Sequence, residues 1–157
     1  MPAFRPETRQ TQDREIPRVT RYYLGVDGGG TNCRVRLADE HLNTLAEVKN
    51  GRSNLQIDDG EPAFKAISDG TRDVFKAAGI DYAETANTYA CFGMAGGRMD
   101  SARAEFAARP WPFAGVKVYD DIDIAHAGAL GGGEGGVIIV GTGSAAMSIV
   151  SGKRYQA

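Results

Sequence analysis

The sequence has no long apolar run, and none of its segments approaches the roughly 20 consecutive apolar residues needed to span a bilayer. It also has no excess of basic charge, because 18 lysines and arginines stand against 20 aspartates and glutamates, for a net charge of −2. Such a balance attracts the protein neither to nucleic acid nor to anionic lipid. We therefore expect neither nucleic acid nor a membrane as a partner.

Cysteine is scarce as well. Only Cys33 and Cys91 are present, far apart and in no CxxC arrangement. Two isolated cysteines do not make a disulfide framework, and a reducing cytoplasm is the expected location. Both cysteines fall inside predicted strands, where we expect them to be buried core thiols.

Large apolar side chains are few in residues 1–20, where arginines alternate with acidic residues. This segment lacks the apolar core of a signal peptide, and its acidic residues argue against a transit peptide. The composition predicts a disordered polar tail.

Glycine, in contrast, is abundant, and its 21 residues are clustered. The clusters lie at 28–30, 96–97, 131–136 and 141–143, each beside an apolar run. This placement indicates tight turns at strand ends, where the backbone must approach another group closely.

Hydrophobic periodicity predicts an α/β fold. The expected strands cover 22–26, 33–38, 44–49, 88–92, 116–119, 136–140 and 145–150, and the expected helices cover 61–78, 100–108 and 122–130. Strands alternate with helices after the first three strands, which predicts a mixed sheet with helices packed on it. The last two expected strands form a separate hairpin.

The first glycine cluster follows an apolar strand, as Asp27-Gly28-Gly29-Gly30-Thr31. Glycines let several backbone N–H groups point at a phosphate, and Thr31 adds a hydroxyl. Asp27 would repel a phosphate unless a cation intervened, which suggests a water-mediated magnesium contact. The alternative is an ordinary Asp-Gly hairpin. Neither the P-loop nor the dinucleotide-binding pattern is present.

A strand with Asp-Gly-Gly-Gly-Thr, a later strand ending near Asp120-Asp121, and a second hairpin with Gly-Thr-Gly-Ser resemble the actin-like ATPase superfamily, which includes sugar kinases. The stretches Val26-Asp27-Gly28-Gly29-Gly30-Thr31, Gly93-Met94-Ala95-Gly96-Gly97 and Val140-Gly141-Thr142-Gly143-Ser144 are most similar to the BadF/BadG-type ATPase family, over residues 22 to 152. The resemblance implies an actin-like (ribonuclease H-like) lobe over 21–134, with a mixed five-stranded sheet and flanking helices. It also implies that 135–157 are the first hairpin of a second, truncated lobe.

The resemblance also implies roles for individual residues. Asp121 would be the catalytic base that takes the proton of a sugar hydroxyl, and Asn54, Gly96 and Gly97 would contact the sugar. The ATP phosphates would be held by Gly28, Gly29, Gly30 and Thr31 and by Gly141, Thr142, Gly143 and Ser144, with Asp27 near Mg²⁺. A carboxylate at the end of a strand suits phosphoryl transfer independently. Its neighbour Asp120 can equally cap the next helix.

The implied function is an ATP-dependent amino-sugar kinase, of the N-acetylglucosamine or glucosamine type, present here as an amino-terminal portion. Ala145 stands where some such kinases have a sugar-contacting asparagine, so the sugar stays open. Two alternatives are an activator ATPase of a radical dehydratase, which would hold an iron–sulfur cluster, and a non-catalytic sugar sensor or truncated remnant. A homodimer of the full-length protein is compatible with this interpretation, and the isolated portion should catalyse little.

Overall fold

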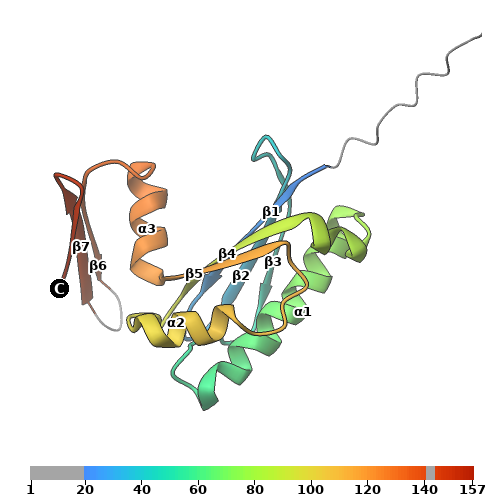
Figure 1. The fold of residues 1–157 in the computed structure, drawn as a ribbon, viewed down its shortest axis with the longest axis horizontal. Helices are drawn as coiled ribbons and strands as arrows, with labels where there is room; N and C mark the ends of the chain where they lie inside the picture. The colour runs from blue at the N-terminus through green and yellow to red at the C-terminus, as the bar shows by residue number, and fades with distance from the viewer. Residues whose placement is uncertain (1–19, 141–143) are drawn as a thin grey trace, which may run out of the picture.

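The computed structural model describes residues 20–140 and 144–157. Its main layer contains β1 (Tyr22–Gly28), β2 (Cys33–Ala38), β3 (Thr44–Asn50), β4 (Thr88–Met94) and β5 (Gly115–Asp120). The strand order is β3-β2-β1-β4-β5 (Figure 1). β1 and β2 are antiparallel, as are β2 and β3, whereas β4 runs parallel to both β1 and β5. The prediction of an α/β lobe with a mixed five-stranded sheet is confirmed.

The core lies on one face of this sheet. Leu24 and Val26 of β1 are buried, whereas Tyr23 and Gly25 between them are exposed. β2 and β4 alternate in the same way. This period of two follows from the pleat of a strand and places every second side chain on the core face.

Helix α1 (Glu61–Ala78) covers the core face over β2 and β3. Pro62 lies in its first turn, and Gly79 ends it with a φ of 69°. Proline suits the first helical turn and glycine the left-handed cap, and the helix has the bounds predicted for it, 61–78. At Gly70 a Cβ would lie 2.7 Å from a methyl carbon of Val35, so the absence of a side chain lets the helix approach the sheet.

Helix α2 (Asp100–Ala107) packs on the same face as α1. Phe106 of α2 meets Phe92 of β4 edge to face, and Trp111 packs against both rings. The Trp111 indole N–H donates to the Phe106 carbonyl at 2.9 Å. This aromatic cluster fixes α2 beside the end of β4 that carries the Gly96–Gly97 turn.

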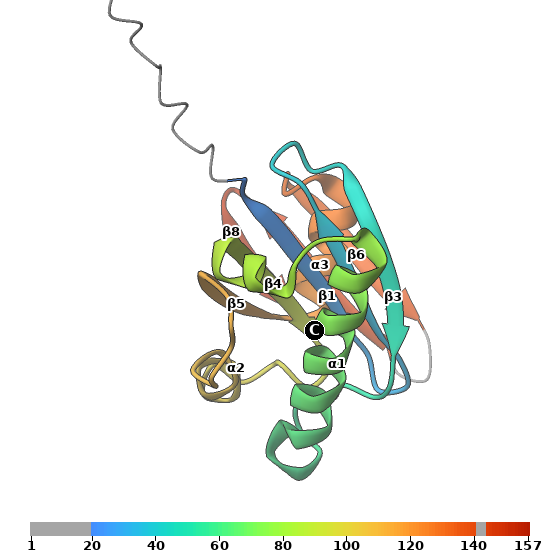
Figure 2. The same cartoon turned by 90° about the vertical axis from the view of Figure 1, so that its right-hand side faces the viewer.

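Helix α3 (Asp121–Leu130) lies on the opposite face, as the two views show (Figures 1 and 2). A Cβ at Gly93 of β4 would lie 2.3 Å from the Ile124 side chain, so that glycine makes room for α3. The helix ends at Gly131, whose φ is 59°. Because α3 begins directly after β5, its first turn lies at the edge where the parallel strands end.

The two cysteines differ in environment. Cys33 is buried, as predicted, and burial raises the pKa of its thiol. The prediction for Cys91 was wrong, because this residue is exposed on the face opposite the core. The alternation of β4 places Ala90 and Phe92 inside, so Cys91 between them must point outward.

A second sheet follows α3, with strands β6 (Gly135–Val140), β7 (Ser144–Val150) and β8 (Lys153–Gln156) in the order β6-β7-β8. A hairpin was predicted here, but the structure has a third strand after the turn at Ser151–Gly152. Two 3₁₀ helices, η1 (Asp58–Gly60) and η2 (Tyr82–Asn87), also escaped prediction. Short polar strands and single turns carry little periodic signal. Among residues 20–140 and 144–157, no helix is long and apolar enough to cross a membrane.

Candidate active site

The candidate site lies where β1, β4 and β5 end side by side. Gly28, the last residue of β1, pairs with Met94 of β4, which in turn pairs with Asp120 of β5. Parallel strands present their carboxyl ends at one edge of a sheet, where ligands of α/β proteins commonly bind. The first glycine turn, the Gly96–Gly97 turn and Asp121 are therefore neighbours, although 93 positions separate Gly28 from Asp121.

The first glycine turn joins β1 to β2. The Gly29 N–H donates to the Asn32 carbonyl at 2.8 Å and closes the turn. A Cβ at Gly28 would lie 2.6 Å from the Met94 sulfur, so that position has no room for a side chain. Gly30 and Thr31 are exposed, and no described residue accepts a hydrogen bond from either N–H. These two donors are free to meet a phosphate.

The segment after β3 is fastened to this turn. The Ser53 N–H and hydroxyl both donate to the Gly29 carbonyl, at 3.1 and 3.4 Å. The Ala95 N–H donates to the Gly28 carbonyl at 2.6 Å, and the Leu55 N–H donates to the Ala95 carbonyl at 3.0 Å. Three loops are thus joined into one rigid edge. Ser53 was not predicted as a site residue, because the sequence shows only a small polar residue before Asn54 and nothing of its partner.

Asn54 and Gly96 are in direct contact across these loops. Asn54 is half-buried, and its side-chain oxygen accepts a hydrogen bond from the Gln56 N–H at 2.8 Å. A Cβ at Gly96 would lie 2.5 Å from that oxygen. Because the oxygen is engaged, the amide N–H groups of Asn54 are the ones left for a ligand. The structure therefore brings these two predicted sugar-site residues together.

Gly97 connects this region to the base of α3. A Cβ on Gly97 would lie 2.8 Å from the Met94 carbonyl oxygen and 3.0 Å from that of Tyr119. The Arg103 guanidinium, from α2, donates to the Gly97 carbonyl and also contacts the Asp100 carboxylate. Arg103 was not predicted, and only its spacing of three from Asp100 on a helix could have indicated it.

Asp120 and Asp121 have separate tasks at the start of α3. Asp120 is 5% exposed and caps the helix, accepting a hydrogen bond from the Asp121 N–H at 3.2 Å. Asp123 completes a capping box by accepting from the Asp120 N–H. The capping alternative weighed for Asp120 is therefore what the structure shows. This leaves the Asp121 carboxyl outside the capping hydrogen bonds.

The Asp121 carboxyl is half-buried, and burial raises its pKa, with the Asp120 carboxylate as the next cause. The Asp27 carboxylate contributes in the same direction, which means that it lies within electrostatic reach. A carboxylate with a raised pKa is a stronger base than an ordinary one. This environment suits a proton acceptor, which is the role predicted for Asp121.

Asp27 is exposed, next to the last position of β1, and pairs with Arg34 of β2. Within the described part of the chain, no three His, Cys, Asp or Glu side chains are arranged to hold a metal. Mg²⁺ commonly takes only one or two carboxylates and completes its shell with water and substrate phosphates. Asp27, exposed beside the first glycine turn, would be such a carboxylate and would hold the cation through water.

Three residues of the second glycine turn, Gly141, Thr142 and Gly143, lie outside the described residues. Ser144 is described: it is exposed and opens β7, where it pairs with Val140 of β6. The predicted second phosphate contact thus remains a prediction for all four residues.

The second sheet is tied to the first turn of α3. The Gln156 side-chain amide donates to the Asp120 carboxylate at 3.0 Å, and the Arg154 guanidinium donates to the Asp123 carboxylate at 2.8 Å. The ring of buried His126 lies 3.1 Å from the Gly135 carbonyl oxygen. The contacts of Arg154 and Gln156 were not predicted, because β8 itself was not.

Comparison with known proteins identifies the family of this chain. Residues 24–157 match the model of the BadF/BadG/BcrA/BcrD ATPase family. A glucosamine kinase from Vibrio cholerae is 31% identical over 134 residues, which are 85% of this chain and 45% of that protein. An N-acetylmuramic acid/N-acetylglucosamine kinase from Clostridium acetobutylicum is 28% identical over 127 residues, or 79% of this chain and 41% of that protein.

A solved structure from Chromobacterium violaceum, provisionally named an N-acetylglucosamine kinase, superimposes with a TM-score of 0.81. It is 28% identical and covers 89% of this chain, which in turn covers 49% of it. A ROK-family glucokinase from Streptomyces griseus shares the fold, with a TM-score of 0.60 and 22% identity. The match covers 85% of this chain and 46% of the glucokinase. The chain spans less than half the length of each of these relatives.

Proposed function

This chain belongs to the BadF/BadG/BcrA/BcrD ATPase family, and from that premise we propose that the protein is an ATP-dependent amino-sugar kinase. It would transfer the γ-phosphate of ATP to a hydroxyl group of glucosamine or of an N-acylated form. The two relatives named as amino-sugar kinases support this substrate class. The sugar and ATP would be its small-molecule partners, and the cytoplasm, which supplies ATP, would be its location.

The observation that carries the proposal is the position of Asp121. Its carboxyl has a raised pKa and lies at the edge shared by the glycine turn and the Gly96–Gly97 turn. Phosphoryl transfer needs a positioned hydroxyl, a group to accept its proton, and donors for the phosphate charge. In this proposal Asn54 positions the hydroxyl and Asp121 accepts its proton. The N–H groups of Gly30 and Thr31 are the donors for the phosphate charge.

In the proposed reaction the sugar hydroxyl oxygen forms a bond to the γ-phosphorus, and the bond from that phosphorus to the β–γ bridging oxygen breaks. ADP leaves with the electron pair, and Asp121 accepts the hydroxyl proton. The N–H groups of Gly30 and Thr31 would hold phosphate oxygens, together with the second turn at 141–144. Magnesium, held through water by Asp27, would supply charge neutralisation on the phosphates.

The cysteines argue for a kinase over an activator ATPase. An iron–sulfur cluster is held by thiolates. Cys33 is buried between sheet and helix, and Cys91 lies on the outer face of β4. Burial raises the pKa of both thiols, which disfavours the thiolate form that a cluster needs. The absorbance spectrum and iron content of the purified full-length protein separate the two functions.

The test is a coupled ADP-release assay of the full-length protein with ATP, Mg²⁺ and a panel of hexoses and amino sugars. Asp121→Asn should lower kcat by about 10²–10⁴-fold while nucleotide binding persists, because it removes only the proton acceptor. Asp73→Asn, an exposed carboxylate on α1, is the matched control and should keep full turnover. Unchanged turnover in Asp121→Asn would reject the role of Asp121, and inactivity on every amino sugar would reject the function.

A further inference from the structure

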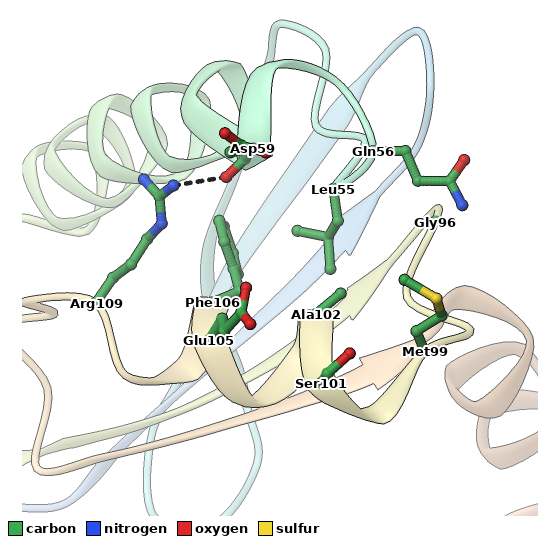
Figure 3. Close-up of a pocket in the computed structure, with 10 residues that line it drawn as sticks. All are labelled: Leu55, Gln56, Asp59, Gly96, Met99, Ser101, Ala102, Glu105, Phe106 and Arg109. Atoms are coloured by element: carbon green, nitrogen blue, oxygen red, sulfur yellow. Dashed lines mark hydrogen bonds between the residues drawn. The ribbon is translucent and has the colours of Figure 1, made fainter.

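A cavity of about 840 Å³ opens beside Gly96, which contacts Asn54, and Figure 3 shows the residues that line the cavity. Leu55 and Gln56 line one side, and residues of α2, among them Ser101 and Glu105, line the other. Its volume lies in the range of small-molecule binding pockets. No step of the proposed phosphoryl transfer uses it.

The cavity shares a wall with the proposed sugar site. Gly96 lines the cavity and touches Asn54. Gln56, which also lines the cavity, contacts the same asparagine, because its N–H donates to the Asn54 side-chain oxygen at 2.8 Å. A sugar held by the Asn54 amide N–H groups and the Gly96–Gly97 turn would therefore have this cavity next to it. A substituent of the sugar can extend there.

The charges that line the cavity are predominantly negative. Arg109, at the far end, is already engaged: its guanidinium donates to the Glu61 carboxylate at 2.6 Å and to the Asp59 carbonyl at 2.7 Å (Figure 3). It also lies over the rings of Phe64 and Phe106. The Asp59 and Glu105 side chains therefore leave the lining with excess negative charge.

The remaining lining suits an uncharged group. Leu55 and Phe106 form an apolar floor, since they are 7% and 3% exposed. Gln56 and Ser101 supply neutral hydrogen-bonding groups at the rim. A carboxylate in this cavity would find no free cation among its described lining residues and would face two carboxylates, so its entry would be unfavourable.

We propose that this cavity is the substituent pocket of the sugar site and that it selects uncharged amino sugars against those that carry a carboxylate. The inference rests on the proposed function and narrows its substrate class. It distinguishes this protein from the Clostridium acetobutylicum relative, whose name includes an acidic amino sugar. Glu105, on the exposed side of α2, is the specificity-determining residue that this proposal assigns.

The experiment compares N-acetylglucosamine with N-acetylmuramic acid, which differs from it by a lactyl ether bearing a carboxylate. In the full-length protein, kcat/KM should favour the neutral sugar by at least about tenfold. Glu105→Lys should raise the ratio of kcat/KM for the acidic sugar over the neutral sugar by roughly tenfold, and Glu105→Gln should raise it less. Glu40→Lys, on the distant β2–β3 turn, is the charge-matched control and should leave the ratio unchanged.

The outcomes separate this inference from the function on which it rests. Equal use of both sugars by the unmodified protein, or a ratio that neither Glu105 variant changes, overturns the pocket while the kinase stands. Phosphorylation of neither these nor any other amino sugar overturns the proposed function and the pocket with it. A ratio that rises in both Glu105 variants and not in Glu40→Lys supports the pocket.

Discussion

The Gln156 side-chain amide donates a hydrogen bond to the buried carboxylate of Asp120 at 3.0 Å, across 36 positions of sequence. Asp120 caps α3 and precedes the proposed base, Asp121. Strand β8 thus holds the first turn of α3 from outside the five-stranded sheet. The proposed catalytic carboxyl owes its position to both sheets.

Replacing Gln156 tests this connection. Gln156→Ala removes a donor from a carboxylate that is 5% exposed, so we expect the free energy of unfolding to fall by about 1–2 kcal/mol. Lys153→Ala, on the same strand but exposed, should change it by less than about 0.5 kcal/mol. Urea unfolding of the full-length protein measures both. Equal stabilities of the two variants would mean that the Gln156–Asp120 contact contributes nothing.

The raised pKa of Asp121 predicts the pH dependence of catalysis. The base must be ionised to accept a proton, so kcat/KM should fall on acidification through a pKa above the ordinary carboxyl value. Asp120→Asn retains a good helix cap but removes the neighbouring negative charge, which lowers the Asp121 pKa. The acidic limb of the pH profile should therefore move to lower pH. An unmoved limb would show that another group controls it.

The raised pKa of Asp121 also affects the pH dependence of folding stability. The effect is opposite to that of most aspartates, whose pKa is lowered by folding. A raised pKa in the folded state means that folding favours the protonated carboxyl, so stability is highest below the ordinary carboxyl pKa. It falls as the pH rises through the raised pKa. Asp121→Asn cannot ionise, so it should raise the unfolding temperature at neutral pH and have no such effect in acid.

Asp69 provides the contrasting control on α1. A hydrogen bond from Lys65 holds its pKa below the ordinary value, so its ionised form favours folding. Asp69→Asn should therefore lower the unfolding temperature at neutral pH and lose this effect as the pH falls through the lowered pKa. Thermal unfolding at neutral and at acidic pH compares Asp69→Asn with Asp121→Asn. If the unfolding temperatures of both variants changed in the same direction at neutral pH, the raised pKa assigned to Asp121 would be contradicted.

Gly97 and Gly128 differ in the space around them. At Gly97 a Cβ would lie 2.8 Å from the Met94 carbonyl oxygen, whereas at Gly128, within α3, nothing lies within 4 Å. Gly97→Ala should cost about 1–3 kcal/mol of stability and raise the KM for the sugar severalfold. Gly128→Ala should stabilise by about 0.5–1 kcal/mol. Chemical unfolding and steady-state kinetics report on both, and a neutral Gly97→Ala would show that the turn can relax.

The elements with strong periodicity were predictable from sequence. The predicted helix over 61–78 has the bounds of α1, and the first two predicted strands match β1 and β2 within two residues. The predicted residues Asn54 and Gly96 meet in the structure because the parallel strands end at one edge. The family resemblance indicated these residues, whereas local pattern alone gave only glycine turns.

What escaped prediction depends on contacts between distant segments. The exposure of Cys91 follows from the phase of β4, which an apolar segment does not reveal. The role of Gln156 requires β8, a four-residue strand with no apolar alternation to indicate it. Ser53 and Arg103 act through backbone carbonyls of other loops, and side-chain spacing carries no information about such partners.

Arg103 is a positioning residue whose test follows from its contacts. Its guanidinium donates to the Gly97 carbonyl and contacts Asp100, three positions earlier on α2. Arg103→Met should leave the Gly96–Gly97 turn less fixed beside Asn54. We expect the KM for the sugar to rise by roughly three- to tenfold with kcat changed less, because substrate positioning is affected more than proton transfer.

Arg72→Met is the matched control, because Arg72 also contacts an aspartate three positions earlier, Asp69, but lies on α1 away from the turn. It should lose the same kind of exposed ion pair without a change in KM. Arg103→Lys can still reach one acceptor but not both, so it should restore part of the affinity. An equal KM in Arg103→Met and Arg72→Met would assign Arg103 to the packing of α2 alone.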